Sequence, residues 1–298
     1  MTPPPFPLRR CASRRKSRCA WYANAMLTMA SLALPSAIQA QSAPLFADGF
    51  ESEQLGGGAS GNDFINDSGV GWCATASAIN LPCPQPGWPQ QDGERGRDAL
   101  AATGSLPKIG GGRAGFDFTK VSSQGVMLPA SATQWACVHD EVTGLTWELK
   151  HDGGGGARDY RNRFSWYDPN PATNGGHPGS PGGTSTCNNS LNGAACNTYE
   201  YVRHINAVGL CGENDWRMPS HRELLSIVDR SAYSPRVDTD YFKPFFVNSL
   251  QGPYSYWTAT PAANGQGAWW VNFSNTGVSN ATNASLNWIM LVRGGANQ

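Results

Sequence analysis

Apolar residues recur at helical intervals in two segments of the C-terminal half of the chain. In residues 198–209 they fall on one helical face, and Gly209 ends the segment. In residues 220–229 they follow Ser220 and Glu223, which have the spacing of a capping box. We therefore expect two helices, whose buried stripes are Tyr201, Val202, Ile205 and Val208 in the first and Leu224, Leu225, Ile227 and Val228 in the second.

Strand-like patterns lie on both sides of these helices. Residues 137–150 alternate like a strand, a turn at Thr143-Gly144 and a second strand. Residues 151–196 form a long loop rich in Gly, Asn, Pro and Ser. Further strand-like pieces occupy residues 254–260, 268–273 and 287–293. Two helices, a small, mostly antiparallel sheet and long loops predict an α+β domain.

The first 40 residues have the pattern of a secretory signal peptide. Six basic residues and no acidic ones precede a short apolar run at residues 25–37. The small residues Ala37 and Ala40 favour cleavage after Ala40. The run is short for a transmembrane helix, so an uncleaved anchor is the less favoured alternative. Arg14-Arg15 is a weak twin-arginine pattern, and Met26 is an alternative start. We expect an exported protein that is periplasmic, cell-surface or extracellular, with no transmembrane segment after cleavage.

Removal of residues 1–40 changes the charge of the chain. Six of the 22 basic residues leave with this segment, so 16 basic residues face 22 acidic ones, a net charge of −6. A nucleic-acid binder needs a basic face to meet phosphates, and this composition argues against one. It also disfavours tight binding to sulfated polysaccharides unless a local basic patch compensates.

Six cysteines follow residue 40, and an even number in an exported chain predicts three disulfides. The spacing favours two short loops and one long-range bond. A structural zinc site is disfavoured, because the chain has no Cys-x-x-Cys pair and no histidine at ligand spacing from one. The favoured pairs are Cys73–Cys83, Cys187–Cys196 and Cys137–Cys211.

Composition divides the exported part into three regions. Residues 41–61 are rich in Gly, Ser and Ala and predict a flexible leader. Residues 62–133 are expected to form an extended N-terminal arm packed on the main domain, which comprises residues 134–298. The glycine run at 110–115 is assigned to the arm, since it lacks the Lys-Ser/Thr of a nucleotide-binding loop.

Several motifs of the main domain together resemble the Lcl C-terminal domain family, named for the domain that ends Legionella collagen-like adhesins. The resemblance spans residues 134–296 and rests on the order and spacing of short motifs. These are Cys137-Val138-His139-Asp140, Thr143-Gly144-Leu145-Thr146-Trp147, Asp215-Trp216-Arg217-Met218-Pro219-Ser220, Glu223-Leu224, Val228-Asp229, Tyr256-Trp257-Thr258-Ala259-Thr260, Ala268-Trp269 and Val292-Arg293-Gly294-Gly295.

The resemblance implies a C-type-lectin-like fold and a role in adhesion, since the best-known members are adhesins that bind glycosaminoglycans. This chain has no Gly-X-Y collagen stalk, so trimer-driven avidity is not implied and the oligomeric state stays open. We expect an exported, non-catalytic recognition or adhesion module for surface or extracellular polysaccharide or glycoconjugate. The alternatives are a structural module that binds an envelope protein, and a hydrolase.

The hydrolase is the weakest of these alternatives. The sequence has no Gly-x-Ser-x-Gly elbow and no His-Glu-x-x-His motif. A glycosidase needs only two suitably separated carboxylates, however, and a sequence does not reveal that separation.

Aromatic and basic side chains are the candidate ligand-binding residues. Four tryptophans inside the motifs, Trp147, Trp216, Trp257 and Trp269, are expected in the core. An outward-facing aromatic ring offers a flat apolar face to the C–H groups of a sugar, and arginines would suit an anionic glycan. The stacking candidates are Trp166, Tyr167, Trp270 and Trp288, and the basic candidates are Arg158, Arg161 and Arg163, near Lys150 and His151.

Two further predictions concern charged residues. Asp229, Asp238 and Asp240 are candidate ligands for calcium, which prefers carboxylate oxygens. Their spacing matches no EF-hand loop, so solvated loop carboxylates are the alternative. Arg217 is expected to form a structural ion pair with a carboxylate such as Asp229 or Asp215.

Overall fold

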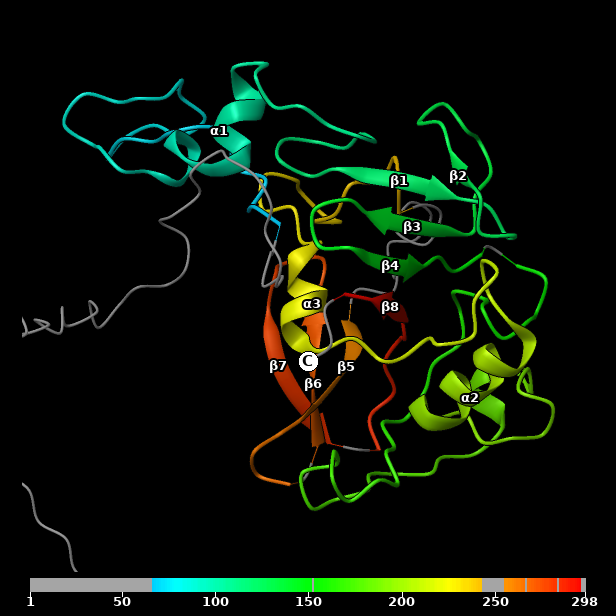
Figure 1. The fold of residues 1–298 in the computed structure, drawn as a ribbon. Helices are drawn as coiled ribbons and strands as arrows, with labels where there is room; N and C mark the ends of the chain where they lie inside the picture. Colours follow the sequence, from blue (N-terminus) through cyan, green and yellow to red (C-terminus); the bar gives the residue numbers. More distant parts are fainter. Residues whose placement is uncertain (1–65, 152, 243–254, 266, 283, 296–298) are drawn as a thin grey trace, which may run out of the picture. The chain divides into compact units, whose positions relative to one another are not determined.

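The computed structural model describes residues 66–151, 153–242, 255–265, 267–282 and 284–295 (Figure 1). The predicted signal peptide and leader lie outside these residues. In the described part, no helix has the length and apolar character needed to cross a membrane. The helices are η1 (Asp92–Glu94), α1 (Gly96–Ala102), η2 (Ser185–Cys187), α2 (Thr198–Val208) and α3 (His221–Ser226). The strands are β1 (Phe118–Val121), β2 (Met127–Leu128), β3 (Cys137–Asp140), β4 (Leu145–Glu148), β5 (Ser255–Pro261), β6 (Gly267–Asn272), β7 (Val278–Thr282) and β8 (Val292–Gly294).

The described strands form two antiparallel sheets. The larger has the order β2-β1-β3-β4-β8, and the smaller has the order β5-β6-β7. Helix α3 packs against β5 and β6 (Figure 1). The predicted α+β class with small antiparallel sheets and few helices is therefore confirmed.

The hairpin of β3 and β4 forms as the sequence predicts. Gly144 adopts a φ of 70° in the turn, a backbone conformation that glycine tolerates best, and its amide donates to the Asp140 carbonyl at 2.8 Å. The register places Cys137 opposite Glu148 and Val138 opposite Trp147. Every residue of β4 is buried. The strand lies between β3 and β8, Leu145 and Trp147 pack into the core, and Glu148 contacts Lys150 and Tyr201.

Local capping patterns set the ends of both main helices. The Asn197 side chain caps α2, and the Ser220–Glu223 capping box starts α3 as predicted. Helix α3 ends at Ser226, three residues before the predicted end, because the Asp229 carboxylate accepts hydrogen bonds from the amides of the following turn. The prediction that Val208 is buried is wrong, since its side chain is 64% exposed.

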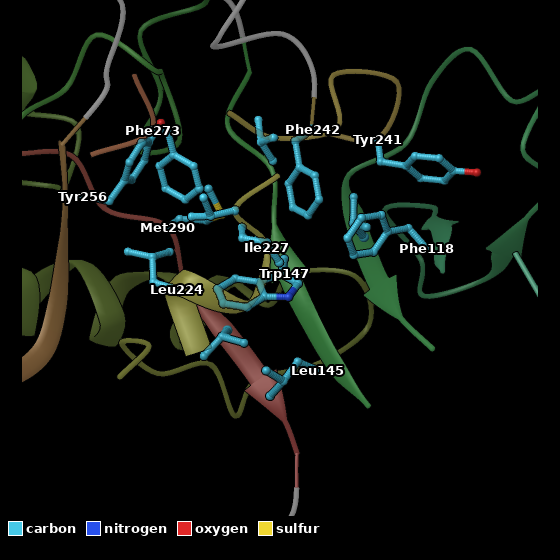
Figure 2. Packing of buried hydrophobic residues seen from close by; sticks show 14 of the residues in the cluster. Phe118, Leu145, Trp147, Leu224, Ile227, Tyr241, Phe242, Tyr256, Phe273 and Met290 are labelled. Atoms are coloured by element: carbon cyan, nitrogen blue, oxygen red, sulfur yellow. The ribbon is translucent and has the colours of Figure 1, made fainter. Parts of the chain in front are cut away.

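Two clusters of apolar side chains make up the core. One joins the five-stranded sheet to α3 and the small sheet, with Trp147 and Leu224 near its centre (Figure 2). The other surrounds α2 and includes Trp216 and Trp257. Trp147, Trp216 and Trp257 are buried, as predicted for tryptophans inside the motifs. The prediction that Trp269 is also a core residue is wrong, because its side chain is only half-buried.

Residues upstream of 134 contribute directly to the larger sheet. Strand β1 pairs with β3 along its whole length, so this sheet contains strands from both sides of the expected boundary at 133/134. The Asn66 side chain donates to the Asp140 carboxylate at 2.5 Å, and the Arg230 amide donates to the Ser68 carbonyl at 2.8 Å. The first described residues are thus tied to β3 and to the loop after α3.

Three disulfides join Cys73 to Cys83, Cys137 to Cys211 and Cys187 to Cys196. These are the pairs that the spacing favours. The Cys137–Cys211 bond closes a sequence separation of 74 residues and connects β3 to the segment after α2. The other two close separations of 10 and 9 residues.

Candidate functional site

A groove with a volume of about 550 Å³ lies between the loop that follows β4, helix α2, the start of α3 and the end of β8. This volume falls within the roughly 300–1,000 Å³ that is typical of small-molecule sites. We call it the tyrosine groove. Its lining residues are Trp166, Tyr167, Asp168, Thr173, Thr198, Tyr199, Val202, Arg217, Met218, Ser220, Glu223, Ala259, Gly294 and Gly295.

Two tyrosine rings form the aromatic side of the groove. The rings of Tyr167 and Tyr199 meet edge to face, with centroids 6.2 Å apart and an interplanar angle of 84°. Thr198, the first residue of α2, holds the loop against the helix, because its hydroxyl donates to the Tyr167 carbonyl at 2.7 Å and accepts from the Tyr167 amide at 2.8 Å. Tyr199 is 38% exposed, so part of its ring faces solvent.

A bidentate ion pair forms part of the polar side. Arg217 donates to both carboxylate oxygens of Glu223, at 2.9 and 2.6 Å, and to the Gly294 carbonyl at 3.2 Å. The Ser220 amide donates to the same carboxylate at 2.7 Å. Burial alone would raise the pKa of Glu223, but the hydrogen bonds from Arg217 and Ser220 hold that pKa below its ordinary value. Glu223 is therefore held as an ionised carboxylate.

The partner of Arg217 differs from the prediction. Asp215 pairs instead with Arg293, at 2.6 Å, and hydrogen bonding from Arg293 lowers the pKa of Asp215. Asp229 accepts hydrogen bonds from Ser231 and Ala232. The partner of Arg217 is Glu223, which lies in the first turn of α3, so its carboxylate is close to the arginine that precedes the helix.

Asp168 adds a further carboxylate to the groove. Its oxygens accept from the Thr173 hydroxyl at 2.6 Å and from the Asn170 amide at 2.9 Å. Each carboxylate oxygen has two lone pairs, so the group retains acceptor capacity. Among the described residues, the charged side chains that line the groove are Asp168, Arg217 and Glu223, with a formal sum of −1.

The predicted basic cluster does not form one open patch. Lys150 is buried, and its ammonium group lies 2.8 Å from Glu148 and contacts the Tyr201 hydroxyl. Burial lowers the pKa of Lys150 to about 8, even though Glu148 favours its charged form. Arg158 donates to the carbonyls of Ala136 and Leu149, and so holds the backbone around this buried group.

The other two arginines lie closer to solvent. Arg161 pairs with Asp159 through two hydrogen bonds, at 2.9 and 2.6 Å, and these bonds lower the pKa of Asp159 to about 2. Arg163 is exposed, and its guanidinium carbon lies 6.0 Å from the centroid of the Trp288 ring. The structure therefore brings Arg163 and Trp288 together, and we call this pair the arginine–tryptophan face.

The aromatic candidates separate into different environments. Trp166 is 2% exposed and its indole donates to the Thr258 carbonyl at 3.0 Å, which corrects its assignment as an open stacking residue. Trp288 packs against the core cluster of Tyr256, and its indole donates to the Tyr160 carbonyl at 2.8 Å. Half-buried Trp270 packs against the other cluster, that of Trp257. Of the stacking candidates, Trp166 and Tyr167 line the tyrosine groove.

The three aspartates proposed for calcium do not gather. Asp229 caps the turn described above, and Asp238 accepts from the amides of Arg113 and Asp240, both within 2.9 Å. Burial raises the pKa of Asp238, against the effect of these hydrogen bonds. Throughout the residues that the structure describes, no three His, Cys, Asp or Glu side chains form a group that could hold a metal ion.

Sequence reasoning missed Tyr199 and the pairing of Glu223 with Arg217. Tyr199 precedes the first predicted buried residue of α2 by two positions, so helical periodicity already directs it away from the core. That outward position was the available signal. The approach of Tyr167, Arg217 and Gly294 to the same helix depends on tertiary folding, and no local pattern indicates it.

The fold and the groove together define a disulfide-bonded α+β module with a mixed aromatic and polar recess. The model of the Lcl C-terminal domain family matches residues 136–293, more than half of the chain, and the chain belongs to this family. It is a non-enzymatic, adhesin-associated domain family. No curated protein and no solved structure matches the chain. The disulfides and the family are consistent with an exported protein.

Several residues of the family motifs line the tyrosine groove. Arg217, Met218, Ser220 and Glu223 come from the segment around the start of α3, Ala259 comes from β5, and Gly294 and Gly295 come from the end of β8. Tyr167 and Tyr199, in contrast, lie outside the motifs. The groove thus combines a motif-derived polar side with an aromatic side that this chain supplies from its long loop and from α2.

Proposed function

We propose that the protein is an exported, non-catalytic recognition module that binds surface or extracellular polysaccharide, and that the tyrosine groove holds the ligand. The supporting observation is the groove itself, where two tyrosine rings face an ion pair and a carboxylate with spare acceptor capacity. A sugar ring presents C–H groups on its faces and hydroxyls around its edge. An aromatic side and a fixed polar side therefore complement the two kinds of surface that a sugar carries.

The ionisation of Glu223 supports a non-catalytic role. A glycosidase needs a carboxylic acid that stays protonated near neutral pH in order to protonate the leaving group. The hydrogen bonds from Arg217 and Ser220 shift the pKa of Glu223 in the opposite direction. Glu223 is therefore suited to accept hydrogen bonds from a ligand and unsuited to the general-acid role.

Glycan-array screening of three proteins tests this proposal. The full chain, exported into an oxidising compartment so that the disulfides form, is compared with Tyr199→Ala and with the control Tyr233→Ala, whose tyrosine is 89% exposed. We expect the wild type and the control to bind the same polysaccharide, and Tyr199→Ala to bind it about tenfold more weakly, equivalent to about 1.4 kcal/mol.

Circular dichroism establishes that all three proteins are folded. Absence of glycan binding by the folded wild type would contradict the recognition role. Equal binding by Tyr199→Ala and the wild type would contradict the assignment to the groove. Release of reducing ends from a bound glycan by the wild type would contradict the non-catalytic assignment.

A further inference from the structure

The charges in and around the tyrosine groove restrict the class of glycan that it can hold. Arg217, which lines the groove, has both terminal nitrogens hydrogen-bonded to Glu223. The described residues that line the groove therefore leave no cation to neutralise the carboxylate of Asp168. A sulfate or uronate brought into this recess would meet a net negative charge at short range.

Two arginines beside the groove, Arg203 and Arg293, are also paired with carboxylates. Arg203, whose guanidinium lies 5.6 Å from the centroid of the Tyr199 ring, pairs with Glu200 at 3.2 Å. Arg293, next to the lining residue Gly294, pairs with Asp215 at 2.6 Å and with Glu213 at 3.3 Å. An acidic glycan would have to compete with these carboxylates for Arg203 or Arg293, and would gain little net attraction from either.

The acceptor groups of the groove suit the same class of ligand. The carboxylates of Asp168 and Glu223 only accept hydrogen bonds when ionised, and the Gly294 carbonyl is another acceptor. Hydroxyl and amide groups of a sugar can donate to these oxygens, whereas sulfate and carboxylate oxygens cannot. The tyrosine rings add an apolar surface on which an uncharged sugar face can lie without desolvating a charge.

We infer that the tyrosine groove is a site for a saccharide that carries no acidic groups, such as a neutral or N-acetylated oligosaccharide. This inference rests on the proposed recognition function and narrows its ligand class. It separates the groove from the arginine–tryptophan face, where Arg163 is exposed and, among the described residues, has no carboxylate within ion-pair distance.

Calorimetric titrations with two sets of oligosaccharides test the inference. One set is non-acidic, with manno-, cello- and N-acetylchito-oligosaccharides, and the other is acidic, with heparin-derived and polygalacturonate oligosaccharides. The full-chain wild type, Tyr199→Ala, Arg163→Ala and the control Tyr233→Ala are each titrated at about 50 mM and about 500 mM NaCl, because salt screens exposed charges.

We expect the wild type to bind a member of the non-acidic set with a Kd that changes less than about twofold between the two salt concentrations. Tyr199→Ala should weaken this binding by about tenfold, and neither Arg163→Ala nor Tyr233→Ala should change it.

Three outcomes would overturn the inference, and they differ in what they mean for the proposed function. Binding of an acidic glycan that Tyr199→Ala abolishes would refute the ligand class but leave the groove as the site. Binding that Arg163→Ala abolishes and Tyr199→Ala does not would refute both the ligand class and the location. Absence of binding to either set, by protein with its disulfides intact, would count against the recognition function as well.

Discussion

The long-range disulfide should stabilise the protein more than a local one. Joining Cys137 to Cys211 constrains 74 residues of the unfolded chain, whereas joining Cys187 to Cys196 constrains 9. In the chain-entropy model these constraints are worth about 4.4 and about 2.6 kcal/mol at 25 °C. All four cysteines are buried, so replacing each pair by alanine removes a similar amount of packed sulfur. The expected difference in unfolding free energy between the two variants, about 1.8 kcal/mol, therefore reports the difference in loop-closure entropy.

Guanidinium unfolding of the two double variants, Cys137→Ala/Cys211→Ala and Cys187→Ala/Cys196→Ala, measures this difference. We expect the first to lose more unfolding free energy than the second, and to show the larger rise in m-value because its unfolded chain is less constrained. Equal losses, or a larger loss from the local pair, would refute the loop-closure argument and indicate that packing around each bond sets its contribution.

Two further predictions concern buried or half-buried charge. Asp159→Asn should lower the unfolding free energy by about 1 kcal/mol at pH 7. This is less than the full pKa shift of Asp159 would give, because solvent around the partly exposed Arg161 screens the ion pair. Because the pKa of Asp159 is depressed to about 2, this stabilisation is present above the ordinary pKa of an aspartate and is lost as pH falls through 2, so the two pH–stability curves should converge there. Curves that stay parallel would contradict this assignment. Lys150→Met should cost about 3–5 kcal/mol by leaving Glu148 buried without its closest cation, and Glu148→Gln/Lys150→Met should cost less than Lys150→Met alone. A double variant less stable than Lys150→Met would contradict this reasoning and show that the remaining partners of Glu148, such as Arg158, stabilise its charge without Lys150.

Features that depend on neighbouring residues were predictable from the sequence. The Ser220–Glu223 capping box and the Gly144 turn need only residues within a few positions, and both form as expected. Helix α2 follows the predicted bounds because its periodicity and its Gly209 stop agree. The pairing of Cys137 with Cys211 follows from elimination once the two short loops are assigned.

Other features had no local signal. Strand β7 has the sequence Val-Ser-Asn-Ala-Thr, whose side chains are half-buried or exposed at the edge of the small sheet, so little hydrophobic pattern marks it. Strand β1 follows a glycine run that suggests an irregular arm, yet it pairs along its whole length with β3. Backbone pairing decides both cases, because β7 pairs with β6 and β1 pairs with β3.

The candidate site was only partly predictable for the same reason. A count of basic residues between 150 and 163 suggests a cationic patch, but burial of Lys150 and the pairing of Arg161 with Asp159 remove most of it. The tyrosine groove draws on segments more than 90 residues apart, and hydrogen bonds between Thr198 and the loop backbone hold Tyr167 beside Tyr199. Residue composition does not record such long-range contacts.

Hydrogen–deuterium exchange with and without a bound oligosaccharide tests most directly whether the tyrosine groove is the binding site. Ligand contact should slow exchange in the peptides that line the groove, at residues 166–173, 198–202 and 217–223. We expect protection in these three segments and none around residues 158–163. Protection confined to residues 158–163 and the segment around Trp288 would contradict it and place the ligand on the arginine–tryptophan face.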